Sequence, residues 1–406
     1  MSMVQSYSAA KPPLRVDPQR FQRDPHKVFA ELRENHPVIQ IDEHGYMALR
    51  ARDVSEILTG KQTIQMEGRD YARLRRIPPG YACRLLQDLF LLSNNDDHRA
   101  KRGLFAPTFS LRAVEALRED VRSTADAIVK DLPRGEPFDF IKRMASRVPS
   151  ELIAAILGLS RPEAAFLADR VYRMSQVVSP VYPLECHDEI EAATAEIFHH
   201  VKDQLCQRMD RPRGDSLSCL AADWKKNRMI SFPSLINQVL GIIAGGTDTT
   251  RATFAMMVSL LLRHPDQWKK LNFNRNLIPG AVAETMRFEP AAGSVARYTT
   301  EEMKVSGIRL PAGVILRTSL MSALRDPELY TDPDRFDITR TDHPRLHPAL
   351  GLGPHRCIGE FLARMEMEES LAALLDGVSG IRVDIWPKLL GFGGLRQVTP
   401  MIVCIR

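Results

Sequence analysis

The chain has few cysteines and no close pair among them. Its 406 residues include six cysteines, and none of them forms a C-x-x-C motif. This density is too low for the disulfide framework of a small secreted domain. We therefore expect most of them to be reduced thiols in the core. The six are Cys83, Cys186, Cys206, Cys219, Cys357 and Cys404.

Basic stretches and uninterrupted apolar runs are also scarce. The net charge of +5 is small for this length, and there is no Lys/Arg block or basic-aromatic repeat, so nucleic acid is not an expected partner. The opening stretch, MSMVQSYSAAKPPLRVDP, lacks the apolar core of a secretory signal. The longest apolar run, Leu235 to Leu262, could span a bilayer by length, but it contains Asn237, Gln238, Asp248 and Arg251, and charges are costly in lipid. We expect a buried central helix in a cytoplasmic, unanchored protein.

The patterns that are present are mainly helical. An apolar fraction of 44% and a charged fraction of 26% are typical of a globular protein with a sizeable core. Two segments, Tyr298 to Ser319 and Ile381 to Arg406, instead carry β-branched runs between turn residues. No repeat or linker divides the chain, so residues 1–406 are predicted to form one mainly α domain with small β-sheets near 298–319 and 381–406. Apolar residues recur at helical spacing in the central run and in Val114 to Lys130, Ser150 to Leu157, Glu189 to Met209 and Phe361 to Leu375.

The central helix contains two adjacent glycines that need an explanation. Gly245 and Gly246 each cost about 1 kcal/mol relative to alanine in a helix. Thr249 lies four residues after Gly245, so its hydroxyl can bond to that carbonyl and open the helix beside a small ligand or water. Asp248 supplies an acid that can exchange protons with such a water. A packing notch against a neighbouring helix explains the glycines equally well.

A second helix carries a carboxylate and a guanidinium on one face. Glu284 and Arg287 are three residues apart, and Glu289-Pro290 ends that helix. The same spacing is typical of a solvated surface ion pair, so the motif is weak by itself.

The stretch LGLGPHRCIGE, residues 350–360, surrounds Cys357 with glycines. It is not a dinucleotide-binding loop, because Arg356 stands where the third glycine is required and no strand precedes it. A zinc site formed with His343, His347 and His355 remains open, although the spacings match no common zinc module.

Two further roles for Cys357 are open on the residues alone. A nucleophilic cysteine could use His355 as a base and the amides of the following helix, but this explains neither the glycines nor the central helix. A thiolate ligand to haem iron explains more, because glycines let the backbone approach a flat macrocycle and direct amides at the sulfur. The helix that is predicted to begin near Ile358 would add its positive end.

Taken together, these motifs resemble those of the cytochrome P450 haem-thiolate monooxygenases. The family's central-helix signature is matched by residues 245–250, GGTDTT, and its Glu-x-x-Arg motif by Glu284 and Arg287, with Arg335 in DPDRF as the expected third member. Leu350 departs from the family's usual phenylalanine, and Glu360 replaces a usual small residue. The cysteine loop is matched by Gly351, Gly353, His355, Cys357 and Gly359.

The resemblance implies a cytochrome P450 fold, with haem b between the long central helix and the cysteine loop. Cys357 would be the axial thiolate, and Gly245 and Gly246 would face the haem. Asp248 and Thr249 would deliver protons through ordered water. Glu284, Arg287 and Arg335 would form a structural triad beneath the haem. The haem propionates would be bound by His98, Arg102, Arg297 and His355.

The resemblance also implies a reaction, RH plus O2, two electrons and two protons giving ROH and water. The chain has no convincing flavin or nicotinamide motif, so a ferredoxin-type electron donor with its reductase is expected. The protein itself is expected to be a monomer. A non-catalytic haem-binding sensor is the alternative of another class. The donor could dock on basic residues that are equally interpreted as solvated surface charge, namely Arg99, Lys101, Arg345, Arg356 and Arg364.

The prediction of the substrate rests on a single group of arginines. Five arginines precede the His98 segment, and they could hold a substrate carboxylate or could be solvated helix charge. The first interpretation predicts an apolar acid, either a terpenoid, with a diterpenoid carboxylic acid such as a gibberellin precursor as one candidate, or a fatty or aromatic acid. The five are Arg69, Arg73, Arg75, Arg76 and Arg84.

Overall fold

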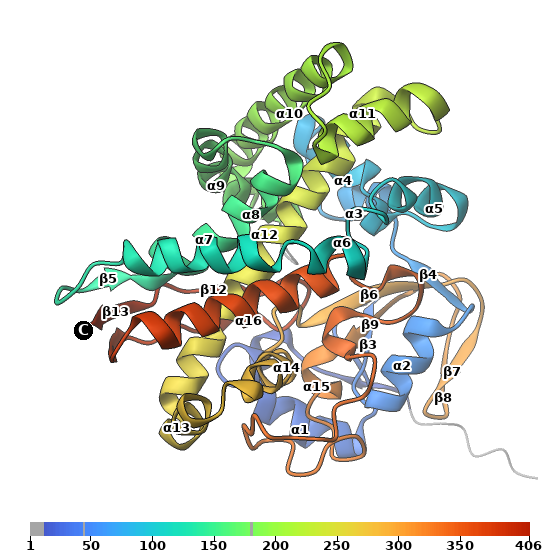
Figure 1. Ribbon diagram of the computed structural model, residues 1–406. Helices are drawn as coiled ribbons and strands as arrows, with labels where there is room; N and C mark the ends of the chain where they lie inside the picture. Colours follow the sequence, from blue (N-terminus) through green and yellow to red (C-terminus); the bar gives the residue numbers. More distant parts are fainter. Residues whose placement is uncertain (1–11, 44, 179–181) are drawn as a thin grey trace, which may run out of the picture.

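A long central helix, α12 (Phe232–Arg263), crosses the middle of the molecule in the computed structural model, which describes residues 12–43, 45–178 and 182–406. Shorter helices surround it, and α16 lies along α7 (Figure 1). The other helices are α1 (Pro25–Asn35), α2 (Ala51–Thr59), α3 (Gly68–Leu74), α4 (Tyr81–Asp88), α5 (Asn95–Gly103), α6 (Leu111–Glu115), α7 (Arg118–Lys130), α8 (Arg147–Leu157), α9 (Arg161–Ser175), α10 (His187–Asp210), α11 (Ser216–Asn227), α13 (Pro265–Phe273), α14 (Ile278–Phe288), α15 (Leu320–Ala323) and α16 (Glu360–Gly377).

The polar residues inside the long apolar run have partners within the protein. Asn237 donates to the Asp88 carboxylate at 3.0 Å, and the Gln238 side chain bonds to the backbone of Asp88 and of Phe90. Ser231 caps the start of α12 by accepting from the Ser234 amide. These bonds satisfy groups that would be costly to bury alone. In the part of the chain that the structure describes, no helix combines the length and apolarity that a membrane span needs.

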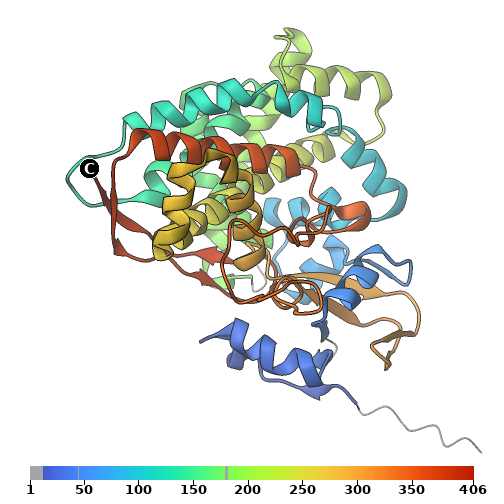
Figure 2. The ribbon, with the colours of Figure 1, turned by 60° about the horizontal axis from the view of Figure 1, so that its bottom comes forward.

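Within the described ranges, four small sheets lie beside the helices. The largest has six strands in the order β1-β2-β3-β9-β6-β4, in which β3 and β9 are parallel and β9 and β6 are antiparallel. Figure 2 shows α1 and α11 at opposite ends of the molecule, with this sheet toward the α1 end. The strands are β1 (Leu14–Arg15), β2 (Val38–Gln40), β3 (Gly45–Ala48), β4 (Thr63–Gln65), β5 (Phe138–Asp139), β6 (Ser294–Thr299), β7 (Met303–Val305), β8 (Ile308–Leu310), β9 (Ile315–Ser319), β10 (Ile381–Ile385), β11 (Leu389–Leu390), β12 (Gln397–Val398) and β13 (Ile402–Ile405).

The sequence predictions of the elements are confirmed with three differences. The helix predicted over 114–130 is broken into α6 and α7, because the Leu117 amide bonds to Val114, three residues back, and this tighter turn redirects the chain. The sheet near 298–319 also recruits strands of two to four residues from the first 65 positions, too short to show an alternating pattern. All six cysteines are free as expected, but only Cys83 is fully buried.

Candidate functional site

The cysteine loop packs against α2 and leads into α16. Gly351 and Gly353 have φ values of +75° and +71°, in the left-handed region that favours glycine. A Cβ on Gly353 would also lie 2.6 Å from the Leu58 carbonyl of α2. The Arg356 side chain closes the loop by donating to the Gly351 carbonyl at 2.7 Å and to both oxygens of Glu360. The conformation and packing of the loop therefore explain why glycine stands at 351 and 353 and arginine at 356.

Cys357 lies between this loop and the start of α16. Its amide donates to the Leu350 carbonyl at 2.8 Å, so Leu350 contributes a backbone contact here. The Cys357 side chain is accessible, yet it lies deep enough that burial raises the pKa of the thiol. The backbone amide of Gly359 donates to the sulfur and opposes this rise. Amides directed at the sulfur stabilise its thiolate form, as a metal-bound cysteine requires.

Four other predicted residues gather on the same side of the molecule from three separate segments. His98 and Arg102 lie on α5, Arg297 on β6 and His355 in the cysteine loop. The rings of His98 and His355 are 4.1 Å apart between centroids. Arg297 is 3% exposed and donates to the Gln65 side chain. Arg102 and Arg297 both interact electrostatically with His355, and Arg102 also interacts electrostatically with Cys357. The structure therefore brings all four together near the cysteine.

Buried nitrogen atoms at this cluster lack partners. Among the described residues, His98 Nε2 and His355 Nδ1 are buried without a hydrogen bond. Burial, followed by the charges of His98, Arg297 and Arg102, lowers the pKa of His355 to about 3, and burial lowers the pKa of Arg297 to about 10. Unsatisfied buried imidazole nitrogens, each of which donates in one tautomer, fit an anionic partner when they lie beside two guanidinium groups. The propionates of a haem with its iron on Cys357 match this set of donors.

In the central helix, the predicted bond between Thr249 and Gly245 is present, and the helix is continuous. The Thr249 hydroxyl donates to the Gly245 carbonyl at 3.0 Å, but α12 is uninterrupted, so the predicted local opening is wrong. A Cβ on Gly245 would meet no atom of the described residues within 4 Å, whereas one on Gly246 would lie 2.6 Å from the Ile153 side chain of α8. Gly246 is therefore a packing notch, and Gly245 leaves open space beside Thr249.

Asp248 is held by two neighbours. Its carboxylate pairs with Arg251 one turn later and accepts from the Ser175 hydroxyl at 3.2 Å, at the end of α9. The Arg251 guanidinium also lies 4.7 Å from the centre of the Tyr172 ring on α9. Asp248 is 9% exposed, so this acid connects the central helix to α9 from a nearly buried position.

The Glu-x-x-Arg pair is fully buried, but its predicted third member is wrong. Glu284 and Arg287 are both 0% exposed and form two bonds of 2.7 and 2.8 Å. Arg340, not Arg335, approaches Glu284, at 3.4 Å, with its side chain 6% exposed. The Arg335 side chain is 64% exposed, and this residue contributes its backbone carbonyl to Arg287. The chain turns between the two arginines, and spacing alone could not show which side chain points inward.

The zinc alternative is not supported by the geometry. His343 faces Glu284 at 3.6 Å, and His347 lies 3.1 Å from the Ala283 carbonyl. Within the described ranges, no group of three or more metal-ligating side chains could hold a metal ion. His343 and His347 therefore belong to the packing around α14 and not to the Cys357 site.

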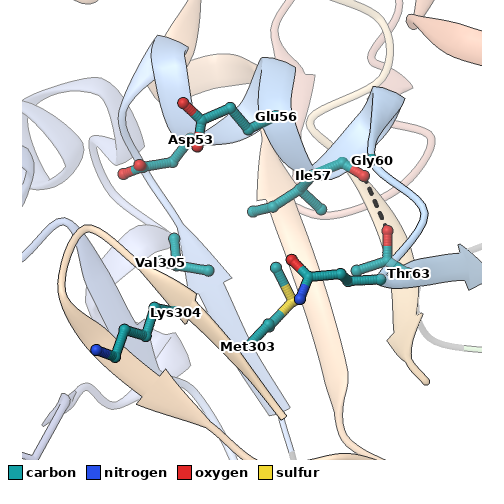
Figure 3. Close-up of a pocket in the computed structure, with 9 residues that line it drawn as sticks. Asp53, Glu56, Ile57, Gly60, Thr63, Met303, Lys304 and Val305 are labelled. Carbon is teal, nitrogen blue, oxygen red and sulfur yellow. Dashed lines mark hydrogen bonds between the residues drawn. The ribbon is translucent and has the colours of Figure 1, made fainter. Parts of the chain in front are cut away.

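A surface pocket elsewhere does not involve the candidate residues. It lies between α2 and the hairpin β7–β8, with Asp53, Ile57 and Lys304 among its lining residues (Figure 3). The Thr63 hydroxyl donates to the Ile57 carbonyl across it, and Asp53 accepts from Ser306. Both polar groups are thus satisfied by the fold, and none of the predicted site residues lines this pocket.

Sequence reasoning missed a buried acid beside the central helix. Glu366 on α16 is 1% exposed, and burial raises its pKa to about 8, while a hydrogen bond with the Thr250 side chain opposes this. One of its oxygens has no hydrogen-bond partner among the residues described. The signal was available, because Glu366 is four residues from the apolar Leu362 and so shares its buried face.

Comparisons with known proteins agree on one family. The model of the family Cytochrome P450 matches residues 18–378. The chain is 34% identical over 385 residues to the plant-inducible Cytochrome P450-pinF1 of Rhizobium radiobacter, covering 95% of this chain and 91% of that protein. It is 29% identical over 374 residues to Nocardicin C N-oxygenase of Nocardia uniformis subsp. tsuyamanensis, covering 90% and 91%. The structure of the enzyme CxnD, for C-S bond formation in chuangxinmycin biosynthesis, superimposes with a TM-score of 0.87 at 25% identity, covering 97% of this chain and 98% of that one.

Proposed function

The chain belongs to the cytochrome P450 family and is a bacterial-type haem-thiolate monooxygenase, and from this premise we propose that it oxidises an apolar carboxylic acid with electrons from a separate ferredoxin and its reductase. The reaction converts RH, O2, two electrons and two protons to ROH and water. One observation carries the site assignment, namely the unpartnered nitrogens of His98 and His355, whose rings lie 4.1 Å apart between centroids. Arg102, which acts electrostatically on His355, also interacts with Cys357. We favour a terpenoid acid, with a fatty or aromatic acid as the alternative, and a relative named Pentalenic acid synthase, 27% identical over 372 residues, supports a carboxylic acid in the reaction.

In this proposal Cys357 holds the iron, and four side chains hold the propionates. The Gly359 amide favours the thiolate form of the sulfur, against the effect of burial, and Arg297 and Arg102 supply the positive charge that two propionates need. His98 and His355 donate from nitrogens that are otherwise unpartnered. When bound, thiolate-ligated haem supplies the reductive activation of O2 that ends in oxygen insertion.

Asp248 and Thr249 are proposed to move the protons. The Thr249 hydroxyl lies beside the open space at Gly245, where it can orient a water molecule. The Asp248 carboxylate is nearly buried and can exchange a proton with that water when its contact with Arg251 or Ser175 loosens. Excluding bulk water here protects the oxidant and makes this internal route necessary.

Variants of these two residues test the proton route. Thr249→Ala is expected to consume NADPH, through a surrogate reductase and ferredoxin, while releasing hydrogen peroxide instead of product. Asp248→Asn is expected to lower the turnover number by about 10²- to 10⁴-fold, because it removes the acid. Thr247→Ala is the matched control, since its hydroxyl donates to the Ile243 carbonyl of its own helix. Unchanged coupling of NADPH to product in Thr249→Ala would contradict the role of Thr249.

The proposed donor surface is smaller than the sequence predicted. Lys101 is 6% exposed and pairs with Asp88 and Asp97, so it does not belong to a docking face. Arg356 and Arg364 both pair with Glu360. Of the five basic residues, Arg99 pairs with Asp96 but is 72% exposed, and Arg345 is exposed, so these two support a contact with an acidic ferredoxin.

A spectrum and a turnover assay test the function. Reduced protein with carbon monoxide is expected to show the red-shifted Soret band of thiolate-ligated haem. Product formed with the surrogate ferredoxin system then separates an enzyme from a haem-binding sensor, which would bind ligands without turnover. A colourless preparation, or one without the red-shifted band, would contradict the proposed function.

A further inference from the structure

We propose that Arg317 and Arg75, with Tyr71, bind the carboxylate of the substrate. The inference rests on the proposed function and deepens it, since it names the group by which the acid is recognised. Of the five arginines singled out in the sequence, it retains one, Arg75, and adds Arg317 from β9, which no sequence pattern indicated.

Four of the five arginines that the sequence suggested for carboxylate binding are exposed at the surface. Arg69 and Arg73 are 80% and 78% exposed and lie near Glu67 and Asp70. Arg76 is exposed, and the exposed Arg84 stacks on the Tyr81 ring at 4.5 Å. Solvated charge of this kind contributes little to binding. Arg75 differs, because it is partly buried, lies 5.6 Å from the centre of the Tyr71 ring and forms a side-chain hydrogen bond with Tyr71.

Arg317 brings a second cation to the same place. It lies in the middle of the six-stranded sheet, opposite Met47 on β3 and Ala296 on β6, and directly opposite residues share one sheet face. Its Nη1 atom is buried and has no hydrogen bond among the described residues. Burial lowers the pKa of Arg317, the nearby Asp42 opposes this, and Arg75 lowers it further. The two guanidinium groups are therefore within electrostatic reach of each other.

This arrangement is costly without a bound anion. A buried guanidinium nitrogen without a partner loses its hydration, and a second cation nearby adds repulsion. A carboxylate removes both costs, because its two oxygens can accept from the planar fork of an arginine and from a neighbouring donor. Asp42 offsets part of the charge, but leaves Nη1 unsatisfied.

The cluster is placed for substrate and not for haem. Ala296, opposite Arg317, is the chain neighbour of Arg297, so the cluster lies one residue along β6 from the proposed propionate site but on the other sheet face. An acid held at Arg317 thus keeps its charged end at the sheet, apart from the proposed propionate site.

Matched acids and esters test this site on the haem-loaded enzyme. The probes are dodecanoic acid, hexadecanoic acid and abietic acid, each with its methyl ester, titrated while the spin-state shift of the haem spectrum is followed. Wild type is expected to bind at least one acid about 10- to 100-fold more tightly than its ester. Arg317→Gln is expected to reduce that preference to about 3-fold or less with ester affinity and haem content unchanged. Arg73→Gln, on an exposed arginine, is expected to keep it.

The outcomes separate this inference from the proposed function. A wild type that shows the thiolate-type carbon monoxide spectrum but binds acids and esters alike, or binds none of the acids, contradicts the carboxylate site alone. Loss of haem from Arg317→Gln would instead assign Arg317 to the propionates and also contradict it. Absence of the thiolate spectrum in wild type contradicts the proposed function itself.

Stability gives an independent readout. Because the ligand-free protein bears the cost of an unpartnered guanidinium, Arg317→Met is expected to raise the melting temperature of the ligand-free holoenzyme by about 1 to 3 °C. A fall of several degrees would indicate that Arg317 holds the fold together, and would contradict a ligand-binding role.

Discussion

Cys357→His is expected to abolish substrate oxidation while leaving a protein that still binds haem. Imidazole can replace the sulfur as a ligand, but it donates less electron density than a thiolate, and that donation favours cleavage of the O–O bond. The loop glycines and the Gly359 amide are retained, so the haem site keeps its shape. The measurements are product formation with a surrogate ferredoxin system and the carbon monoxide spectrum, which should lose its red shift.

Cys219→Ser is the matched control for this substitution. Cys219 is also a free, exposed cysteine, but it lies on α11, outside the candidate site. Its variant should keep both the red-shifted band and the wild-type turnover. If Cys357→His kept the wild-type band, or Cys219→Ser lost it, the assignment of the axial ligand would be wrong.

Glu284→Gln is expected to lower the free energy of unfolding by about 3 to 5 kcal/mol, because it leaves the buried Arg287 guanidinium without its counter-charge. Glu284 also accepts from the Asp337 amide at 2.9 Å and lies 3.4 Å from Arg340, so one carboxylate holds three chain segments. Urea unfolding followed by far-UV circular dichroism measures this loss. Wild-type stability in Glu284→Gln would contradict a structural role for the pair.

The two arginines near this pair provide a direct comparison. Arg340→Gln is expected to cost about 2 to 3 kcal/mol, since this side chain is buried against Glu284 and donates to Asp342 at 3.0 Å. Arg335→Gln is expected to stay within about 0.5 kcal/mol of wild type, because its side chain is exposed and its backbone carbonyl still accepts from Arg287. The reverse order of the two effects would restore the sequence prediction of Arg335.

The family and its main motifs could be predicted because they are local in the chain. The GGTDTT segment lies within one helix, and the loop around Cys357 is continuous, so residue type and spacing were enough to identify them. The Thr249–Gly245 bond follows from a four-residue spacing in any helix and is confirmed at 3.0 Å. The pair of Glu284 and Arg287 follows in the same way from a three-residue spacing in a helix.

The fold class, the family and the residues of the cysteine loop could therefore be predicted from local patterns alone. Their long-range partners became visible in the folded chain. Arg340 replaced Arg335, Gly246 proved to be a packing notch against Ile153, and Arg317 joined Arg75. Burial and charge pairing arise where segments distant in sequence converge, and spacing along one segment carries no information about the side chains that another segment contributes.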